Sequence, residues 1–321
     1  MKKSVVMLLI VALLGTMLMG CSKKDEDAVR VGVLKGPTGV GAVLIMDKAE
    51  SGEYDKYSFT LSADPTDIVA RLTNGDLDIG ALPTNTAANL YNKTNGDVQM
   101  IAINCTSVLY ILENGNSIQS VQDLKGKTIY VNGQGANPEY VLNFVLRANG
   151  LEPGKDVDVQ FKEASEISAM MVSDKAEICM LPVPAATTVL MKNDKVRMAL
   201  NIGEEYAKSA NDGSELTMGC LVANKRFVSE RPEAVKLFLE RYEKSIEEVT
   251  KDVKTAAELV ARYEITGNAA IAEKAIPDCG IVCITGKEMK EKLSGYYQVL
   301  YDANPASIGG NIPKDEFYYE K

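Results

Sequence analysis

Short runs of β-branched and aliphatic residues alternate along the first hundred residues with segments whose apolar positions follow a helical spacing. The runs at Arg30 to Leu34, Tyr57 to Ser62 and Leu77 to Leu82 are too short for buried helices and predict strands. Between them, Ala42 to Ala49 and Pro65 to Asn74 have the apolar spacing of helices. This order of strand, helix, strand, helix, strand predicts a mainly parallel sheet.

One strand-to-helix unit occurs twice. Residues Asn74 to Lys93 (NGDLDIGALPTNTAANLYNK) align with Ser173 to Lys192 (SDKAEICMLPVPAATTVLMK), about a hundred residues later. In both copies an acidic residue precedes a Leu-Pro pair, after which a helix begins. The spacing is far longer than a solenoid repeat and matches the size of a lobe. We therefore predict two similar α/β lobes.

The remaining pattern predicts how the chain divides between the lobes. Met100 to Ile111 is a long apolar run with a polar middle at Asn104 to Ser107. It predicts one strand that leaves the first lobe. Residues 202 to 213 lack periodicity, and Leu216 to Ala223 predicts a strand that returns. We expect lobe I at residues 29–113 and 204–321, lobe II at 114–203, two crossings between them and a helical C-terminal extension on lobe I. Its helices are predicted at Pro232 to Val249, Thr255 to Tyr263, Ala269 to Ile276 and Lys287 to Tyr301.

The N-terminus resembles a bacterial lipoprotein signal. Two lysines precede an apolar run from Val5 to Met19, which is too short to span a membrane well, and a small residue precedes Cys21. The resemblance implies a signal peptide at residues 1–20, lipid on Cys21 and a flexible tether at residues 21–28. A plain uncleaved apolar N-terminus is the alternative.

Composition excludes several classes of function. The formal charge is −9 with no basic patch, which argues against nucleic acid, and the chain has no His, the commonest general base and transition-metal ligand. We expect no metal and no cofactor. The cysteines beyond the signal form no disulfide framework, and their pairing stays open: Cys105, Cys179, Cys220, Cys279 and Cys283.

A family resemblance begins at Asp123 to Lys127 (DLKGK), followed by a strand at Thr128 to Val131, the loop NGQGANPEY and a helix from Tyr140 to Ala148. This order is similar to that of solute-binding proteins of ABC importers, in the branch that takes up sulfonates, nitrate, taurine and thiamine-pyrimidine precursors. The resemblance implies the type II periplasmic-binding-protein fold. It also implies a monomeric, non-enzymatic receptor on the outer face of the cytoplasmic membrane, which delivers a small polar or anionic organic solute to a permease.

Two other functions stay open. The first is an enzyme on the same scaffold, similar to pyrimidine synthases or menaquinone-pathway enzymes, although the pyrimidine synthase uses a His that this chain lacks. The second is a surface lipoprotein that binds no solute.

Ligands of open parallel sheets bind at the carboxyl ends of strands, where helix N-termini offer unpaired N–H groups. The loops at these positions carry Thr, Asn and Gly and almost no charge. The alternatives are that Thr84 and Asn137 only cap their helices, and that Lys35 to Gly41 form a plain structural turn. The predicted ligand-binding residues are Gly36, Pro37, Thr38, Thr84, Asn85, Thr86, Ser107, Gln134, Gly135, Asn137 and Pro182.

Overall fold

The computed structural model describes residues 28–320. The predicted signal peptide, the lipidation of Cys21 and almost the whole tether lie outside these residues. Within them, no helix is both long and apolar enough to cross a membrane.

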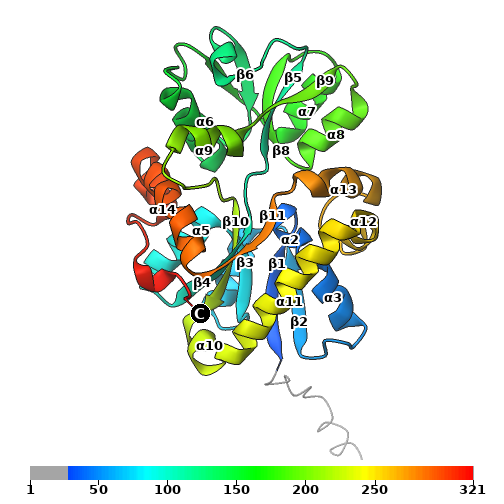
Figure 1. Cartoon of the computed structure of the whole chain (residues 1–321), viewed down its shortest axis with the longest axis vertical. Coiled ribbons are helices and arrows are strands. Elements are labelled where there is room, and N and C mark those ends of the chain that lie inside the picture. Colours follow the sequence, from blue (N-terminus) through cyan, green and yellow to red (C-terminus); the bar gives the residue numbers. More distant parts are fainter. Residues whose placement is uncertain (1–27, 321) are drawn as a thin grey trace, which may run out of the picture.

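The first lobe is built on a sheet of six strands among the described residues, in the order β11-β4-β10-β3-β1-β2 (Figure 1). Three of them are parallel, as predicted: β1 (Val29–Leu34), β2 (Tyr57–Ser62) and β3 (Ile79–Pro83). β10 (Gly219–Asn224) is antiparallel to both β3 and β4 (Val98–Cys105), so the returning strand joins this sheet as expected. The helices that follow the parallel strands are α2 (Pro37–Val40), α3 (Val43–Glu50), α4 (Pro65–Thr73) and α5 (Thr84–Lys93).

The second lobe repeats this plan with five strands in the described part of the chain, in the order β7-β6-β8-β5-β9. β6 (Thr128–Val131), β7 (Asp158–Phe161) and β8 (Ile178–Pro182) are parallel, whereas β5 (Leu109–Asn114) is antiparallel to β8 and β9 (Val196–Asn201). Its helices are α6 (Asn137–Ala148), α7 (Ala164–Val172), α8 (Ala185–Lys192) and α9 (Ile202–Ala210). The β8–α8 unit holds the same place in its sheet as β3–α5 in the first, which confirms that the sequence repeat marks two similar lobes.

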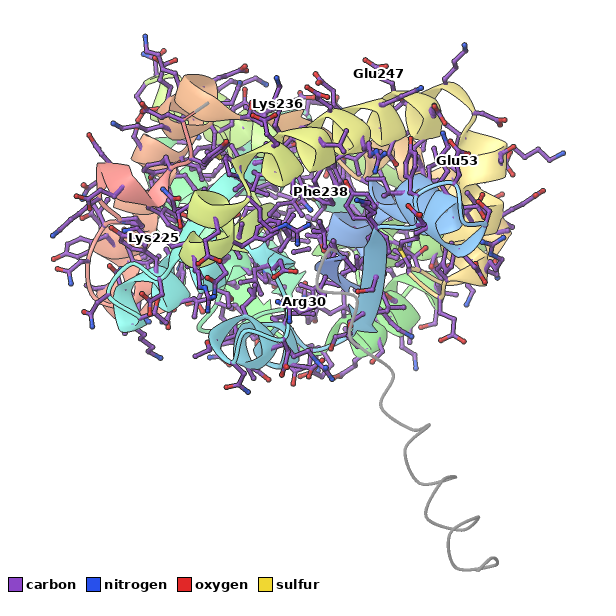
Figure 2. All side chains as sticks on the ribbon, turned by 90° about the horizontal axis from the view of Figure 1, so that it is seen from below. Arg30, Glu53, Lys225, Lys236, Phe238 and Glu247 are labelled. Carbon is purple, nitrogen blue, oxygen red and sulfur yellow. The ribbon has the colours of Figure 1, made fainter. Side chains whose placement is uncertain are left out.

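The C-terminal segment covers both faces of the first sheet. α10 (Lys225–Glu230) leads to the long helix α11 (Pro232–Lys251), whose inner face buries Phe238 against Tyr57 and Tyr242, with ring centroids 6.0 and 5.9 Å away. Figure 2 shows Lys236 and Glu247 of the same helix pointing to solvent, as its amphipathic sequence requires. α12 (Val253–Arg262), α13 (Ala269–Ala275), α14 (Gly286–Ala303) and short 3₁₀ turns complete the chain.

Two of these helices also reach the second lobe. α14 packs against α6, and α13 packs against α8. Figure 1 shows α14 and α13 on opposite sides of the molecule, both at the level where the two lobes meet. The C-terminal extension therefore contacts both lobes and not lobe I alone.

Three predictions about the elements are wrong. Met100 to Ile111 is not one strand, because the chain leaves the first sheet after Cys105 and enters the second at Leu109. Residues 109–113 therefore pair with the second sheet, and residues 204–210 of α9 pack against α6 and β5 of the second lobe, although we assigned both segments to lobe I. The stretch after Asn201 forms α9 despite its weak periodicity, because Asn201 caps it and Ile202 and Tyr206 bury its inner face. The C-terminal extension is not wholly helical, since β11 (Ile281–Ile284) adds an edge strand to β4.

Candidate functional site

Four helices begin at the carboxyl ends of the parallel strands, where the lobes face each other. In the first lobe, two residues separate the end of β1 from the start of α2 at Pro37, and α5 begins at Thr84 directly after β3. In the second lobe, α6 begins at Asn137 after the glycine loop, and α8 begins at Ala185. The structure thus brings the predicted loops to the interface between the lobes, with helix N-termini on both sides of it.

Asn137 joins the two lobes directly. Its Nδ2 donates to Asn85 Oδ1 at 3.1 Å and to the Tyr296 hydroxyl at 3.1 Å, and only 5% of the residue is exposed. Asn85 lies in the first turn of α5 and Tyr296 on α14, so both partners belong to the first lobe. Two residues predicted from separate lobes are therefore in contact.

Thr84 is fully buried at the start of α5. Its N–H donates to the Met218 carbonyl at 3.3 Å, and its own carbonyl accepts from the Tyr297 hydroxyl at 3.1 Å. Its Oγ1 has no hydrogen-bond partner, and neither does Asn137 Oδ1. Buried polar atoms are nearly always paired, because leaving one unpaired is unfavourable by about 1–3 kcal/mol. These two atoms are therefore candidates for hydrogen bonds to a ligand.

Neither side chain is a helix cap. Pro83 and Ala136 occupy the N-cap positions of α5 and α6, and no side chain caps either helix. Thr84 and Asn137 are the first residues inside their helices. Capping, which we considered as the alternative role of both residues, is not what these side chains do.

The prediction missed Asn104 and Thr217. Asn104 Nδ2 donates to the Thr38 carbonyl at 3.0 Å and to the Tyr242 hydroxyl at 3.3 Å, while its Oδ1 and Thr217 Oγ1 are buried without a partner. Both residues are fully buried, Asn104 near the carboxyl end of β4 and Thr217 two residues before β10 begins. The signal for Asn104 was the polar interruption of an apolar strand, whereas Thr217 carried no comparable signal.

Gly219 allows these groups to pack closely. A Cβ at this position would lie 2.3 Å from Thr38 Cγ2 and 2.8 Å from Asn104 Oδ1. Any larger residue would therefore push α2 away from β4 and β10.

The glycine loop of the second lobe contributes less than predicted. Gln134 is exposed, and the Gly135 N–H already donates to Glu139 Oε2 at 2.7 Å. The Gly135 carbonyl accepts from the Tyr140 hydroxyl at 2.6 Å. The backbone amide that we expected to face a ligand is thus occupied by a carboxylate of its own loop.

The other predicted residues lie near the interface without joining the Asn137 contact. The Gly36 N–H donates to the Ile265 carbonyl at 2.7 Å, and Pro182 pairs with Leu109 between β8 and β5. Thr86 follows in the first turn of α5. Ser107 lies on the first crossing and lines a cavity of about 390 Å³ together with Tyr110, Glu204 and Glu215. This cavity lies on the β9 and β11 side of the crossings.

The side chains that form the buried contacts of Thr84 and Asn137 are uncharged. Lys35, the only cation in the predicted loops, forms an exposed ion pair with Glu264 at 3.0 Å. Burial raises the pKa of Tyr296 and of Tyr242, so both phenols stay protonated at neutral pH. No cluster of metal-ligating side chains occurs in residues 28–320, and Cys105, Cys179, Cys220 and Cys279 are free thiols. The interface can therefore donate and accept hydrogen bonds without ionised groups.

Comparison with known proteins identifies the fold. The family model described as NMT1/THI5 like matches residues 31–256. No curated protein matches the chain significantly.

Solved structures resemble it over most of its length. An ABC transporter protein from Parabacteroides distasonis is 21% identical with a TM-score of 0.76, covering 92% of this chain and 100% of its own. The periplasmic aliphatic sulphonate binding protein SsuA from Escherichia coli is 13% identical with a TM-score of 0.70, covering 92% and 93%. A Candida albicans protein described as having the generic periplasmic binding protein fold is 13% identical with a TM-score of 0.52, covering 89% and 96%. At these identities the likeness shows the fold.

Proposed function

This chain belongs to the NMT1/THI5-like family, and we propose that it is an extracytoplasmic receptor that binds a small polar or anionic organic solute for an ABC importer. The observation that carries the proposal is the uncharged interface between two similar lobes. There, Thr84 Oγ1 and Asn137 Oδ1 are buried on opposite lobes without partners. A solute held between the lobes would satisfy both atoms and would favour the closed form.

Binding is favoured over catalysis by the chemistry of the interface. The chain has no His, and the buried phenols have raised pKa values, so neither group supplies a general base at neutral pH. Burial raises the pKa of Cys179 and of Cys279 to about 12, which keeps both thiols protonated and poor nucleophiles. These tyrosines and cysteines are therefore not candidates for a catalytic base or nucleophile at neutral pH.

The partner and the location follow from the same proposal. SsuA of Escherichia coli is a periplasmic sulphonate-binding protein, and the Parabacteroides distasonis protein is an ABC transporter component. By analogy, the partner of this chain is the permease of an ABC importer. Lipid on Cys21 would hold the monomeric receptor at the outer face of the cytoplasmic membrane.

The test is to identify what the protein binds. Native mass spectrometry of the purified mature chain should show a bound small molecule. Thermal shifts with alkanesulfonates, taurine, nitrate and aminopyrimidines would then rank ligand classes. A ligand at 100 times its Kd stabilises the folded state by about 2.7 kcal/mol, which corresponds to several degrees for a protein of this size.

A pair of variants locates the site. Asn137→Ala should weaken binding by about tenfold or more, because it removes buried hydrogen-bonding atoms. Asn143→Ala, on the same helix and only half-buried, should bind as the parent does. If no co-purified molecule and no member of the panel binds, the receptor proposal fails. If both variants bind equally well, the site lies elsewhere.

A further inference from the structure

Helix α14 belongs to the first lobe but inserts an aromatic side chain into the second. The Tyr296 ring lies 6.0 Å from the ring of Tyr206 on α9, edge to face, and Tyr206 lies 5.2 Å from Phe144 on α6. Tyr296 and Tyr206 are both fully buried. Separating the lobes would expose both rings to water, so this contact favours the closed arrangement.

Polar contacts reinforce the aromatic one. The Tyr296 hydroxyl accepts from Asn137 Nδ2 at 3.1 Å, in a bond that is wholly buried. At the end of the same helix, Asn304 Nδ2 donates to the Tyr140 hydroxyl at 3.0 Å. Asn137 and Tyr140 are one turn apart on α6, so the two bonds join α14 to the N-terminal turn of that helix. We call these contacts of Tyr296 and Asn304 the α14 latch.

The neighbouring tyrosine provides an internal reference. Tyr297 is also fully buried, but its hydroxyl donates to the Thr84 carbonyl, within the first lobe. Consecutive residues of one helix thus use the same functional group in two ways. The Tyr296 hydroxyl bonds to the second lobe, whereas the Tyr297 hydroxyl bonds within the first lobe.

We propose that the α14 latch holds the closed form in the absence of ligand, and that Tyr296 is a positioning residue for Asn137. The second half rests on the proposed function, because it takes Asn137 as a ligand-binding residue. The first half depends only on the contacts between the lobes. The ligand then further stabilises a closed form that the protein already favours without it. Opening for ligand entry requires the contacts of the α14 latch to break.

The experiment measures the ratio of closed to open molecules by small-angle X-ray scattering of the mature chain without ligand. Tyr296→Phe keeps the ring and removes the hydroxyl, and loss of one buried hydrogen bond should lower the closed-to-open ratio about fivefold. The radius of gyration should rise accordingly. Tyr297→Phe should leave the profile unchanged, although both variants should lower the urea midpoint of unfolding to a similar extent.

A double-mutant cycle assigns the effect to the contact between the two residues. In an Asn137→Ala background, Tyr296→Phe should cause no further opening, whereas Tyr140→Phe should still do so. The inference is overturned if Tyr296→Phe gives the parent profile, if Tyr297→Phe opens the protein equally, or if the ligand-free parent is already open. Failure of every solute to bind would refute the receptor role and leave the latch result standing.

Discussion

The two copies of the repeated unit keep the same fold but differ in chemistry. In the first lobe, α5 begins at Thr84 directly after β3, and the Thr84 hydroxyl is buried without a partner. In the second lobe, the corresponding residue is the buried, apolar Val183, and α8 begins only at Ala185. The repeat therefore fixes the order of strand and helix, although α8 starts two residues later than α5 in the aligned sequences. The polar groups that the second lobe presents come instead from α6, which lies outside the repeat.

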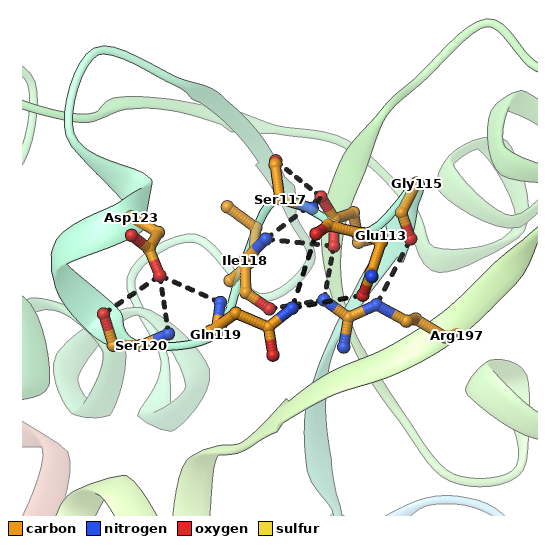
Figure 3. A network of polar contacts seen from close by, with 9 residues as sticks. Glu113, Gly115, Ser117, Ile118, Gln119, Ser120, Asp123 and Arg197 are labelled. Carbon is orange, nitrogen blue, oxygen red and sulfur yellow. Dashed lines mark hydrogen bonds and ion pairs between the residues drawn. The ribbon is translucent and has the colours of Figure 1, made fainter.

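The same divergence affects the acidic residue of the repeat. Asp78 is 7% exposed and accepts from the Arg30 backbone N–H and from its Nε, both at 2.9 Å. Glu177, its counterpart, is exposed. The second lobe buries a different carboxylate, Glu113, at the end of β5 (Figure 3). Each lobe thus has one buried carboxylate bound to an arginine, but only the first lobe takes it from the repeat.

The largest effect is expected from removing the charge of Glu113. Its carboxylate accepts from the Ser117 N–H and hydroxyl at 2.6 Å each and from Arg197 Nη2 at 2.7 Å (Figure 3). Glu113→Gln would leave the guanidinium facing an amide, and we expect a loss of about 3 kcal/mol in the free energy of unfolding. Urea denaturation would measure it. A loss below about 1 kcal/mol would show that this contact does not hold the second lobe together.

The acidic residues of the repeat should differ in the same assay. Asp78→Asn should cost about 2 kcal/mol, less than Glu113→Gln because the Asp78 side chain is 10% exposed and that of Glu113 only 3%. Glu177→Gln should change stability by less than about 0.5 kcal/mol, since its side chain is exposed. Equal effects at the two positions would mean that the repeat has kept a common electrostatic role.

Lowering the pH should reveal how the ionised Glu113 carboxylate contributes to the stability of the fold. Burial alone would raise the pKa of this carboxyl, but hydrogen bonds from Ser117, Ile118 and Arg197 outweigh burial and lower it below its ordinary value of 4.5. Stability from a lowered pKa is fully present above the ordinary value and is lost as pH falls through the folded-state value. The urea midpoint of the parent should therefore fall between about pH 5 and 3 more steeply than that of Glu113→Gln. Parallel curves would contradict this assignment.

The sequence predicted the parts of the fold that follow from local pattern. The repeat was visible because buried strands and helix starts require apolar residues and proline at fixed places, and β2 and β6 have the predicted bounds. The crossing within Met100 to Ile111 was predicted, but the break of the strand at Thr106 to Val108 was missed, because an apolar strand looks the same whichever sheet it joins. Tyr296 and Thr217 were missed because their place at the interface depends on how distant segments pack. Asn85 and Asn137 could be placed at the interface from the sequence because helix starts after parallel strands meet at one edge.

A smaller effect on stability than those of Glu113→Gln and Asp78→Asn is expected from the unpaired hydroxyl that distinguishes the two copies. Thr84→Val keeps the shape of the side chain and removes a buried group without a partner, so the ligand-free protein should gain about 1 kcal/mol of stability. The same variant should bind the identified solute about tenfold more weakly, if the hydroxyl serves the ligand. Thr187→Val, in α8 of the second copy, removes a second buried and unpaired hydroxyl. It should raise stability similarly but leave affinity unchanged, as measured by urea denaturation and calorimetric titration. Weaker binding by Thr187→Val would show that the second copy also supplies polar contacts, and the contrast between the two copies would then be wrong.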